Sequence, residues 1–432
     1  MSRTSIVALK ARRIWDSRGR PTIEAEVMLG CGATGRGIAP SGASRGRHEA
    51  VEKRDGGARF GGADVTGAVT GVNETISPAL LGHDASDQES IDALLIALDG
   101  TPEKSVLGGN AIIAVSLACL NAAAAAHGAS LWSYLKPSEP VLLPLPQIQI
   151  FGGGVHAARR TDIQDFLVIP PNAHSFAEAL GRAMEVYRHA GLLMQKMGRL
   201  RGTADEGGWW PSFTSNTEAL ELLTRAIELA GFVPGSEVGI ALDIAAGELL
   251  TDNHHYRLPL ERLHLDRDGM SELLLRWMDR FPIVSVEDPL AEDDFEGWGR
   301  LTEAIGHRVQ VVGDDLLVTS SERTARAVEC GACNAALIKV NQAGTVTEAR
   351  AAFEAAKAAG WGTIVSARSG ETEDTTIAHL AVGWNAGQIK VGSCARSERV
   401  AKWNELLRLE EELGSRGRFA GATALGTGGR SL

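Results

Sequence analysis

The second half of the chain alternates short apolar runs with stretches long enough for one helix. Six of these runs end in a charged residue or an amide. They are GIALD, PIVSVEDP, VQVVGDD, AALIKVN, TIVSARS and GQIKVG, and the charged groups at their ends are Asp243, Glu287, Asp314, Lys339, Arg368 and Lys390. Functional groups that follow the C-terminal ends of successive strands are typical of a (β/α) barrel. The pattern predicts such a barrel from about residue 141 to about residue 413.

The first third of the chain has a different pattern. Residues 5–40 alternate apolar and polar side chains around turn residues, which predicts a small antiparallel sheet. Segments with helical periodicity or high alanine content follow at 63–80, 87–98 and 109–127. The proline-rich stretch 137–146 then marks a domain boundary. We therefore expect an N-terminal α+β capping domain over 1–138 and a barrel domain over 139–432, whose Gly- and Ser-rich tail is flexible from about 414.

Composition narrows the function classes. The net charge of −11 argues against nucleic acid as the main partner, but it leaves a small anionic substrate open. Five cysteines in 432 residues do not form a disulfide framework. The N-terminus lacks the apolar stretch of a signal peptide, and the most apolar helical segment, 111–126, is shorter than a membrane span. We expect a cytoplasmic protein with no membrane partner.

The acids at the ends of three successive runs form a candidate metal site. Each of Asp243, Glu287 and Asp314, taken alone, is as readily explained as the cap of the next helix. Three in succession at one end of a barrel favour cation binding, and all-oxygen ligands select Mg²⁺ or Mn²⁺ over zinc. Lys339 is either a lysine whose ammonium reaches solvent from a strand end or, near a dication and Lys390, a general base with a depressed pKa.

Longer motifs make the chain similar to the enolase (phosphopyruvate hydratase) family over nearly its whole length. The matching blocks, in the order of the family, are ARRIWDSRGRPTIEAEV (11–27), PSGAS (40–44), DIQDF (162–166), ADEGG (204–208), ALDIAAGE (241–248), PIVSVEDP (282–289), VVGDDLLVT (311–319), LIKVNQAGT (337–345), SGETEDT (369–375) and GQIK with ARSER (387–399). The resemblance implies an α/β fold, in which an N-terminal α+β domain precedes an enolase-like ββαα(βα)6 barrel of the TIM type. It also implies a homodimer or higher homo-oligomer.

The resemblance implies roles for the strand-end residues. Asp243, Glu287 and Asp314 would hold a first Mg²⁺, and Ser44 would join a second Mg²⁺ that arrives with the substrate. Lys339 would remove the proton next to the substrate carboxylate. Further catalytic or substrate-contacting roles would fall to Glu206, which helps the β-hydroxyl leave, and to Asp165, His156, Gln164, Arg368, Ser369 and Lys390. For Gln164, Ser369 and His156, plain polar or solvated loop residues remain an alternative.

Several motif positions depart from the family. Its VSHRSG histidine is Ala367 here, and the glutamate of QEF is shortened to Asp165. Arg45, Arg159 and Arg160 add positive charge to loops that close over the substrate in the family, and arginine suits carboxylate and phosphate groups. Lost volume and added positive charge predict a larger, more anionic substrate than 2-phosphoglycerate, with Arg45 and Arg159 among its ligands.

These departures lead to a specific expectation for the reaction. The protein would be a Mg²⁺-dependent hydro-lyase that resembles the carboxyphosphonoenolpyruvate synthase of phosphonate antibiotic biosynthesis, acting on a phosphono-substituted glycerate. Two alternatives stay open at this point. One is a housekeeping enolase that converts 2-phosphoglycerate to phosphoenolpyruvate in glycolysis. The other is a non-catalytic enolase-like binding protein, against which the retention of Lys339, Lys390 and the three metal acids argues.

Overall fold

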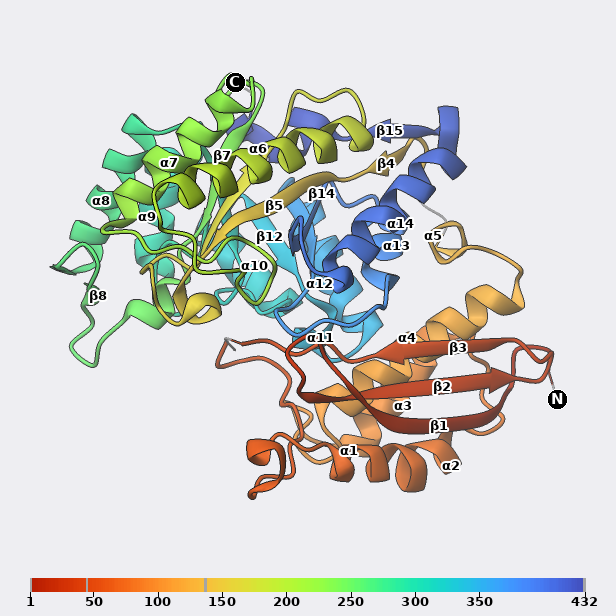
Figure 1. The fold of residues 1–432 in the computed structure, drawn as a ribbon. Helices are drawn as coiled ribbons and strands as arrows, with labels where there is room; N and C mark the ends of the chain where they lie inside the picture. Colours follow the sequence, from red (N-terminus) through yellow and green to blue (C-terminus); the bar gives the residue numbers. More distant parts are fainter. Residues whose placement is uncertain (1, 44–45, 136–137, 430–432) are drawn as a thin grey trace.

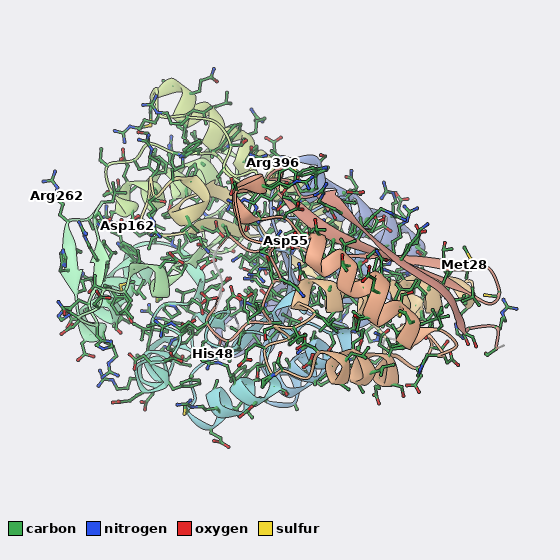
Figure 2. The ribbon with its side chains drawn as sticks, turned by 90° about the horizontal axis from the view of Figure 1, so that it is seen from below. Met28, His48, Asp55, Asp162, Arg262 and Arg396 are labelled. Carbon is green, nitrogen blue, oxygen red and sulfur yellow. The ribbon has the colours of Figure 1, made fainter. Side chains whose placement is uncertain are left out.

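The computed structural model describes residues 2–43, 46–135 and 138–429 of the chain. The side chains of His156 and of residues 427–429 lie outside that description. Figure 1 shows a small sheet with its helices packed beside a larger barrel. In the view of Figure 2, Met28 lies at the outer end of the small sheet and Arg262 at the opposite side of the molecule.

The N-terminal sheet is the antiparallel meander that the alternating pattern predicts. Its strands are paired in the order β1 (Ile6–Trp15), β2 (Pro21–Leu29) and β3 (Thr34–Ile38). Helix α4 packs across the sheet so closely that a Cβ atom at Gly37 would overlap the carbonyl oxygen of Ala114. Glycine is therefore required there because the two backbones approach without a side chain between them.

The helices of this domain cover the buried face of the sheet. They are α1 (Thr66–Gly71), the π-helical turn η2 (Val72–Ile76), α2 (Ser77–Leu80), α3 (Gln88–Asp99), α4 (Gly109–Ala126) and α5 (Leu131–Tyr134), with the short 3₁₀ turn η1 (Arg59–Gly62) before them. Among the described residues, α4 is the one helix long and apolar enough to cross a membrane, and 89% of it is buried inside the protein. It is the core helix of this domain, packed against the sheet and its neighbouring helices.

The second domain is a closed eight-stranded barrel. Its strands follow the order β5 (Leu145–Gly152), β6 (Asp165–Ile169), β7 (Gly239–Asp243), β10 (Ile283–Glu287), β11 (Gln310–Gly313), β12 (Ala335–Ile338), β13 (Gly362–Ser366) and β14 (Gln388–Ser393). Strand β6 runs antiparallel to both β5 and β7, whereas the other neighbours are parallel. Every residue of the eight strands is buried, which explains why they read as apolar runs and not as alternating patterns.

Helices surround the barrel and connect its strands. They are α6 (Phe176–Lys196), α7 (Asn216–Leu229), α8 (Arg267–Arg280), α9 (Phe295–Ile305), α10 (Ser321–Glu329), α11 (Val340–Ala343), α12 (Val346–Ala358), α13 (Thr376–Gly383) and α14 (Ser397–Leu413). Outside the barrel, β8 (Tyr256–Leu258) pairs with β9 (Leu263–Leu265). The 3₁₀ turns of this domain are η3 (Gly154–Ala157), η4 (Ala246–Leu249), η5 (Gly414–Arg416) and η6 (Gly421–Gly429). Two strands, two helices and then six strand–helix units give the expected ββαα(βα)6 order, so the predicted fold class is confirmed.

The segment after residue 413, for which we expected a flexible tail, makes contacts with the barrel domain, and its flexibility stays a prediction. Strand β15 (Gly417–Phe419) pairs in parallel with β4 (Val141–Leu143). Beyond it, Ala424 and Leu425 are buried against the N-terminal ends of the barrel strands, and Gln388 donates a hydrogen bond of 2.9 Å to the Ala424 carbonyl. The segment thus covers the end of the barrel at which the parallel strands begin. The domain boundary expected after residue 138 falls between α5 and β4 and stays a prediction.

Candidate active site

The three acids predicted to bind a metal ion lie at the C-terminal end of the barrel. Asp243 and Glu287 are the last residues of β7 and β10 and face each other in register. Asp314 directly follows β11, whose Val312 is in register with Glu287. The three residues are only 3%, 3% and 6% exposed. The strand register therefore brings residues that are far apart in the sequence to one buried place.

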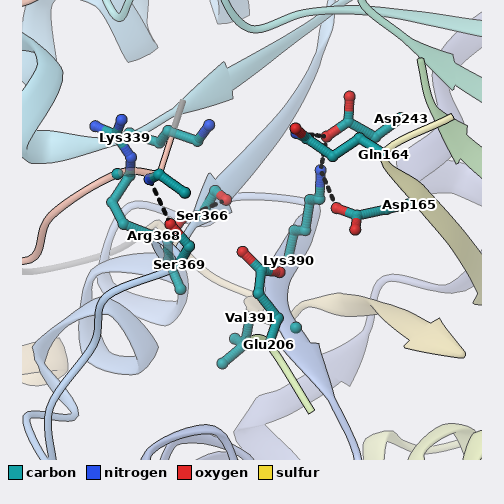
Figure 3. A pocket seen from close by; sticks show the side chains of 14 residues that line it. Gln164, Asp165, Glu206, Asp243, Lys339, Ser366, Arg368, Ser369, Lys390 and Val391 are labelled. Atoms are coloured by element: carbon teal, nitrogen blue, oxygen red, sulfur yellow. Dashed lines mark hydrogen bonds and ion pairs between the residues drawn. The ribbon is translucent and has the colours of Figure 1, made fainter. Parts of the chain in front are cut away.

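Lys390, on β14, points toward Asp243 (Figure 3) and also contacts Glu287. Its Nζ donates to Asp243 Oδ2 at 2.9 Å and to both carboxylate oxygens of Glu287 at 2.8 Å. Burial alone would lower the pKa of Lys390, but the negative charges of Asp243 and Glu287 outweigh it and raise the pKa well above its usual range. Burial, followed by repulsion from Asp243, raises the pKa of Glu287. Lys390 is thus the cation that compensates this pair of buried acids.

Lys339, the predicted base, directly follows β12 and its ammonium contacts Asp314 Oδ2. Burial, the largest single influence, acts to lower the pKa of Lys339, and Arg368 and Lys390 act in the same direction. The negative charges around Lys339, foremost Asp314 and then Glu287, together raise its pKa above the ordinary value. Burial would likewise raise the pKa of Asp314, yet Lys339 holds it below its ordinary value. The depressed pKa that we expected for Lys339 refers to a lysine beside a bound dication and stays a prediction for that state. Without the dication, the Asp314 carboxylate in contact raises the pKa of Lys339 more than the more distant ammonium of Lys390 lowers it.

A narrow cavity opens beside these groups. Figure 3 shows the side chains around it. The predicted residues that line it are Gln164, Asp165, Glu206, Asp243, Lys339, Arg368, Ser369 and Lys390. Ala367, which replaces the histidine of the family motif, also lines the cavity and is 7% exposed. The arrangement therefore combines acids, two lysines and an arginine around a space suited to a small anionic molecule.

The arginine side of the cavity is built by both domains. The Arg368 guanidinium donates to both oxygens of Glu49, at 2.9 and 3.2 Å, and to Asn341 Oδ1 at 3.1 Å. Ser369 Oγ accepts a 2.6 Å hydrogen bond from the backbone N–H of Ala43. Glu49 and Ala43 belong to the N-terminal domain, which therefore covers one wall of the barrel site.

The opposite wall contains Gln164 and Asp165. The Gln149 side chain donates to Asp165 Oδ1, and its own oxygen accepts from the backbone N–H of Gly208 at 2.9 Å. Gln164 Nε2 donates to Asp243 Oδ2 at 3.2 Å. The other atom of that amide, Gln164 Oε1, is buried and has no hydrogen-bond partner in the described part of the chain. A buried oxygen left without a donor next to Asp243 suits a position where a cation or a polar ligand binds.

The donor set fits a hard dication such as Mg²⁺. Asp243, Glu287 and Asp314 offer buried carboxylate oxygens, and the ammonium groups of two lysines balance them in this structure. A second group of acids, Asp288, Asp314 and Asp315, has oxygens within 4.8 Å of one another. The Asp288 carboxylate, however, accepts the backbone N–H groups of Asp314 and Asp315 at 3.0 and 2.8 Å, so it orients this turn and is a weaker candidate ligand.

Other predicted substrate ligands are not part of this cavity. Arg159 is 57% exposed at its side chain and pairs with Glu248 at 2.8 Å, away from the residues that line the cavity. Ser44 and Arg45 lie outside the described residues, as does the side chain of His156. The predicted roles of these three residues stay predictions. The Arg159 guanidinium, which was expected to face the substrate, pairs with Glu248 on another loop in this structure.

The sequence reasoning missed residues that support the site from behind. Glu49, Gln149 and Gln342 are each buried and hydrogen-bonded to a predicted site residue. Gln342 lies in the quoted motif LIKVNQAGT, so its position next to the base was a usable signal. Glu49 belongs to no quoted motif, and nothing local in the sequence indicates its contact with Arg368.

Comparison with known proteins agrees with this geometry. The family models described as "Enolase, N-terminal domain" and "Enolase, C-terminal TIM barrel domain" match residues 6–135 and 140–427. The chain is also 50% identical over 416 residues to a protein named Enolase 1 from Desulfitobacterium hafniense (strain Y51), covering 96% of this chain and 95% of that protein. The chain belongs to the enolase family. It is therefore a hydro-lyase, and enolases generally depend on Mg²⁺.

Membership of the enolase family at this identity corrects the function expected from the sequence. The reading as a carboxyphosphonoenolpyruvate synthase is wrong, because half of the residues match a plain enolase over nearly the full length. The structure weakens its physical basis as well. Arg159 adds no positive charge to the cavity, since it pairs with Glu248. The shortened Asp165 is held by Gln149, so the shorter side chain does not leave an acid without a partner.

Proposed function

We propose that the protein is a housekeeping enolase, which removes water from 2-phosphoglycerate to give phosphoenolpyruvate. The observation that supports this is the joint placement of Lys339, Lys390 and the three buried acids at one end of the barrel, beside Arg368. The reaction needs a base for the proton on the carbon next to the carboxylate, and positive charge where the enolate forms. These side chains offer both within one cavity.

In this proposal Lys339 takes the α-proton on its Nζ, and it must first be neutral to do so. Its contact with Asp314 favours the protonated form as long as the carboxylate has no metal ion to bind. Asp243, Glu287 and Asp314 would hold Mg²⁺, which supplies Lewis-acid stabilisation of the negative charge on the substrate carboxylate when it is bound. A second Mg²⁺ that arrives with the substrate, with Ser44 as a ligand, is part of the proposal.

The remaining lining residues orient the substrate and assist the leaving group. Lys390 keeps a positive charge close to the position of the developing enolate. Arg368 and Ser369, which line the cavity, would bind the phosphoryl group, since guanidinium and hydroxyl groups suit phosphate oxygens. Glu206, which lines the same cavity and is 8% exposed, would protonate the β-hydroxyl so that it leaves as water. Asp165 and Gln164 would face the carboxylate end.

The wider setting of the reaction follows from the same proposal. The substrate is a small phospho-carboxylate, and the acidic surface of the protein gives no indication of nucleic acid as a partner. We propose that the chain acts as a homodimer or higher homo-oligomer in the cytoplasm, as the resemblance implies. Size-exclusion chromatography with light scattering measures the oligomeric state directly, and a monomer would refute that part.

The activity is tested by the ultraviolet absorbance of phosphoenolpyruvate formed from 2-phosphoglycerate in the presence of Mg²⁺. We expect wild-type turnover, and a loss of at least about 10²-fold in kcat for Lys339→Ala, which removes the base. The variant should retain exchangeable Mg²⁺ binding but lose α-proton exchange with solvent. Lys196→Ala, which alters an exposed lysine of α6, serves as the control and should match the wild type. A wild-type protein without turnover, or proton exchange that survives in Lys339→Ala, would contradict the proposal.

A further inference from the structure

One buried amide connects the base, a metal acid and the N-terminal domain. Gln342, in α11, is 2% exposed. Its Nε2 donates to Asp314 Oδ1 at 3.0 Å and to Glu49 Oε1 at 3.3 Å. Its Oε1 accepts from the hydroxyl of Thr319 at 2.7 Å. The side chain thus uses both amide hydrogens and its oxygen inside the protein.

The two acids that Gln342 contacts are each half of a buried ion pair. Asp314 pairs with the proposed base Lys339, and Glu49 pairs with the proposed phosphoryl ligand Arg368. Gln342 therefore lies between two negatively charged carboxylates that belong to different domains. A neutral group with two donor hydrogens satisfies an oxygen of each acid without adding charge, which no carboxylate or hydroxyl side chain can do.

Thr319 fixes the direction of the amide. Its hydroxyl accepts the backbone N–H of Lys339 at 2.9 Å, so its own hydrogen is available for Gln342 Oε1. With the amide oxygen committed to that donor, the nitrogen must face Asp314 and Glu49. The orientation of the Asp314 carboxylate and the backbone of the base are therefore set by one connected group of hydrogen bonds.

The backbone at this point is strained in a way that agrees with such a role. Val318 and Thr319 have φ values of 43° and 53°, in the left-handed region that β-branched residues rarely adopt. Conformations of this kind persist where surrounding contacts hold them, and they gather at functional sites. Thr319 is 1% exposed and its hydroxyl makes two hydrogen bonds, so the surroundings do hold it.

We propose that Gln342 is a positioning residue, which aims the Asp314 carboxylate for cation binding and ties it to the Glu49–Arg368 pair. The inference deepens the function proposed above and rests on it for its effect on turnover. Its effect on cation binding rests on the hydrogen bonds alone. Without the amide, Asp314 would keep its contact with Lys339 but lose the donor that fixes its second oxygen.

The direct test measures the affinity of the protein for Mn²⁺ alone by calorimetry, with no substrate present. Gln342→Met keeps the length of the side chain and removes the amide, and we expect it to weaken Mn²⁺ binding by about 10–100-fold, as is typical when a partner of a metal ligand is lost. In turnover of 2-phosphoglycerate, kcat should fall more than KM rises. Gln310→Met is the matched control, because Gln310 is a buried amide with three hydrogen bonds at the opposite end of β11. It should leave the affinity for Mn²⁺ unchanged.

A second pair of variants separates hydrogen bonding from packing. Thr319→Val keeps the branched shape but loses the hydroxyl, whereas Thr319→Ser keeps the hydroxyl and loses a methyl group. If Thr319 acts by orienting Gln342, the serine variant binds Mn²⁺ like the wild type and the valine variant binds it more weakly. If the position matters only for packing, this order is reversed, and the inference is refuted. Thermal unfolding of each variant verifies that the measured protein is folded.

The results distinguish this inference from the proposed function. A wild-type protein that binds Mn²⁺ but makes no phosphoenolpyruvate refutes the proposed function, and weaker Mn²⁺ binding by Gln342→Met in that protein still supports the inference. Unchanged Mn²⁺ affinity in Gln342→Met and in Thr319→Val overturns the inference, whether or not the wild type is active.

Discussion

Replacing Lys390 with methionine tests whether the positive charge of Lys390 balances the negative charges of the buried acids Asp243 and Glu287. The methionine side chain nearly fills the same space but carries no charge. In the structure the Lys390 ammonium makes contacts of 2.9 Å to Asp243 and 2.8 Å to Glu287, and all three residues are buried. The variant therefore leaves two adjacent carboxylates without their cation, in a place from which water is largely excluded.

The cost can be estimated from this geometry. Removing one partner of a buried ion pair costs about 3–5 kcal/mol, because the remaining charge stays buried. The entropy of unfolding is roughly 2 cal/mol/K per residue, so for 432 residues this corresponds to a fall in Tm of about 3–6 °C. Mg²⁺ should restore more stability to the variant than to the wild type, because in the variant it is the cation that compensates the acids.

The penalty should also depend on pH. Burial and Asp243 already raise the pKa of Glu287, and the loss of Lys390 removes an opposing influence. A carboxyl whose pKa is raised in the folded state stabilises the fold at low pH, and that contribution is lost as the pH rises through the folded pKa. Lys390→Met should therefore be closer to the wild type at about pH 5.5 than at about pH 8.

Differential scanning calorimetry with and without Mg²⁺ measures each of these effects. Lys402→Met is the control, because Lys402 is equally buried and bonds to Glu371 at 3.1 Å and to the Thr372 carbonyl at 2.7 Å, outside the cavity. We expect it to lower Tm with no special response to Mg²⁺. A Lys390→Met protein that melts like the wild type without Mg²⁺, or that gains no more from Mg²⁺ than Lys402→Met does, would refute the reasoning.

Three further predictions follow from other parts of the fold. Asp288→Ala leaves the backbone N–H groups of Asp314 and Asp315 without their acceptor. Urea unfolding should therefore show a free energy of unfolding that is lower by about 1–3 kcal/mol for each N–H group. Burial lowers the pKa of His379 despite the opposing charge of Glu405. The stabilising contribution of the neutral imidazole is therefore lost as the pH falls below 6.5, the ordinary pKa of histidine. His379→Gln should show a smaller fall in Tm between about pH 7 and about pH 5. Leu425→Asp should lower the free energy of unfolding by about 2–5 kcal/mol in the same urea measurement, because Leu425 is buried. If the tail is flexible, the free energy of unfolding should not change.

The barrel was predictable because buried strands have a simple pattern of residues in the sequence. Strands covered on both faces are mostly apolar, and acids stand where several of them end, as at Asp243 and Glu287. For the segment after residue 413, glycine content was interpreted as flexibility, which stays a prediction, although glycine also permits close packing. In the structure, Gly362 and Gly387 lie against Ala424, and the absence of side chains there lets the segment pack closely under the barrel.

The site was only partly predictable. Residues at strand ends are found from local pattern, whereas the contact between Gln342 and Glu49 joins positions 293 residues apart and has no local signature. Arg159 illustrates the same point, although its role as a substrate ligand stays a prediction. The sequence shows a positive charge on a loop near the site, but only the fold shows that Glu248 is close enough to pair with it.

The same long-range contacts show that the two domains act as one unit at the site. Arg368 belongs to the barrel and is 4% exposed, and its guanidinium pairs with the carboxylate of Glu49 from the N-terminal domain. The beginning of α12 depends on the N-terminal domain as well, because Asp92 accepts the backbone N–H of Thr347 at 2.9 Å. A buried charge without its partner is more costly than a lost surface contact. The N-terminal domain is therefore part of the active site and of the stability of the barrel, although the sequence presents it as a separate domain.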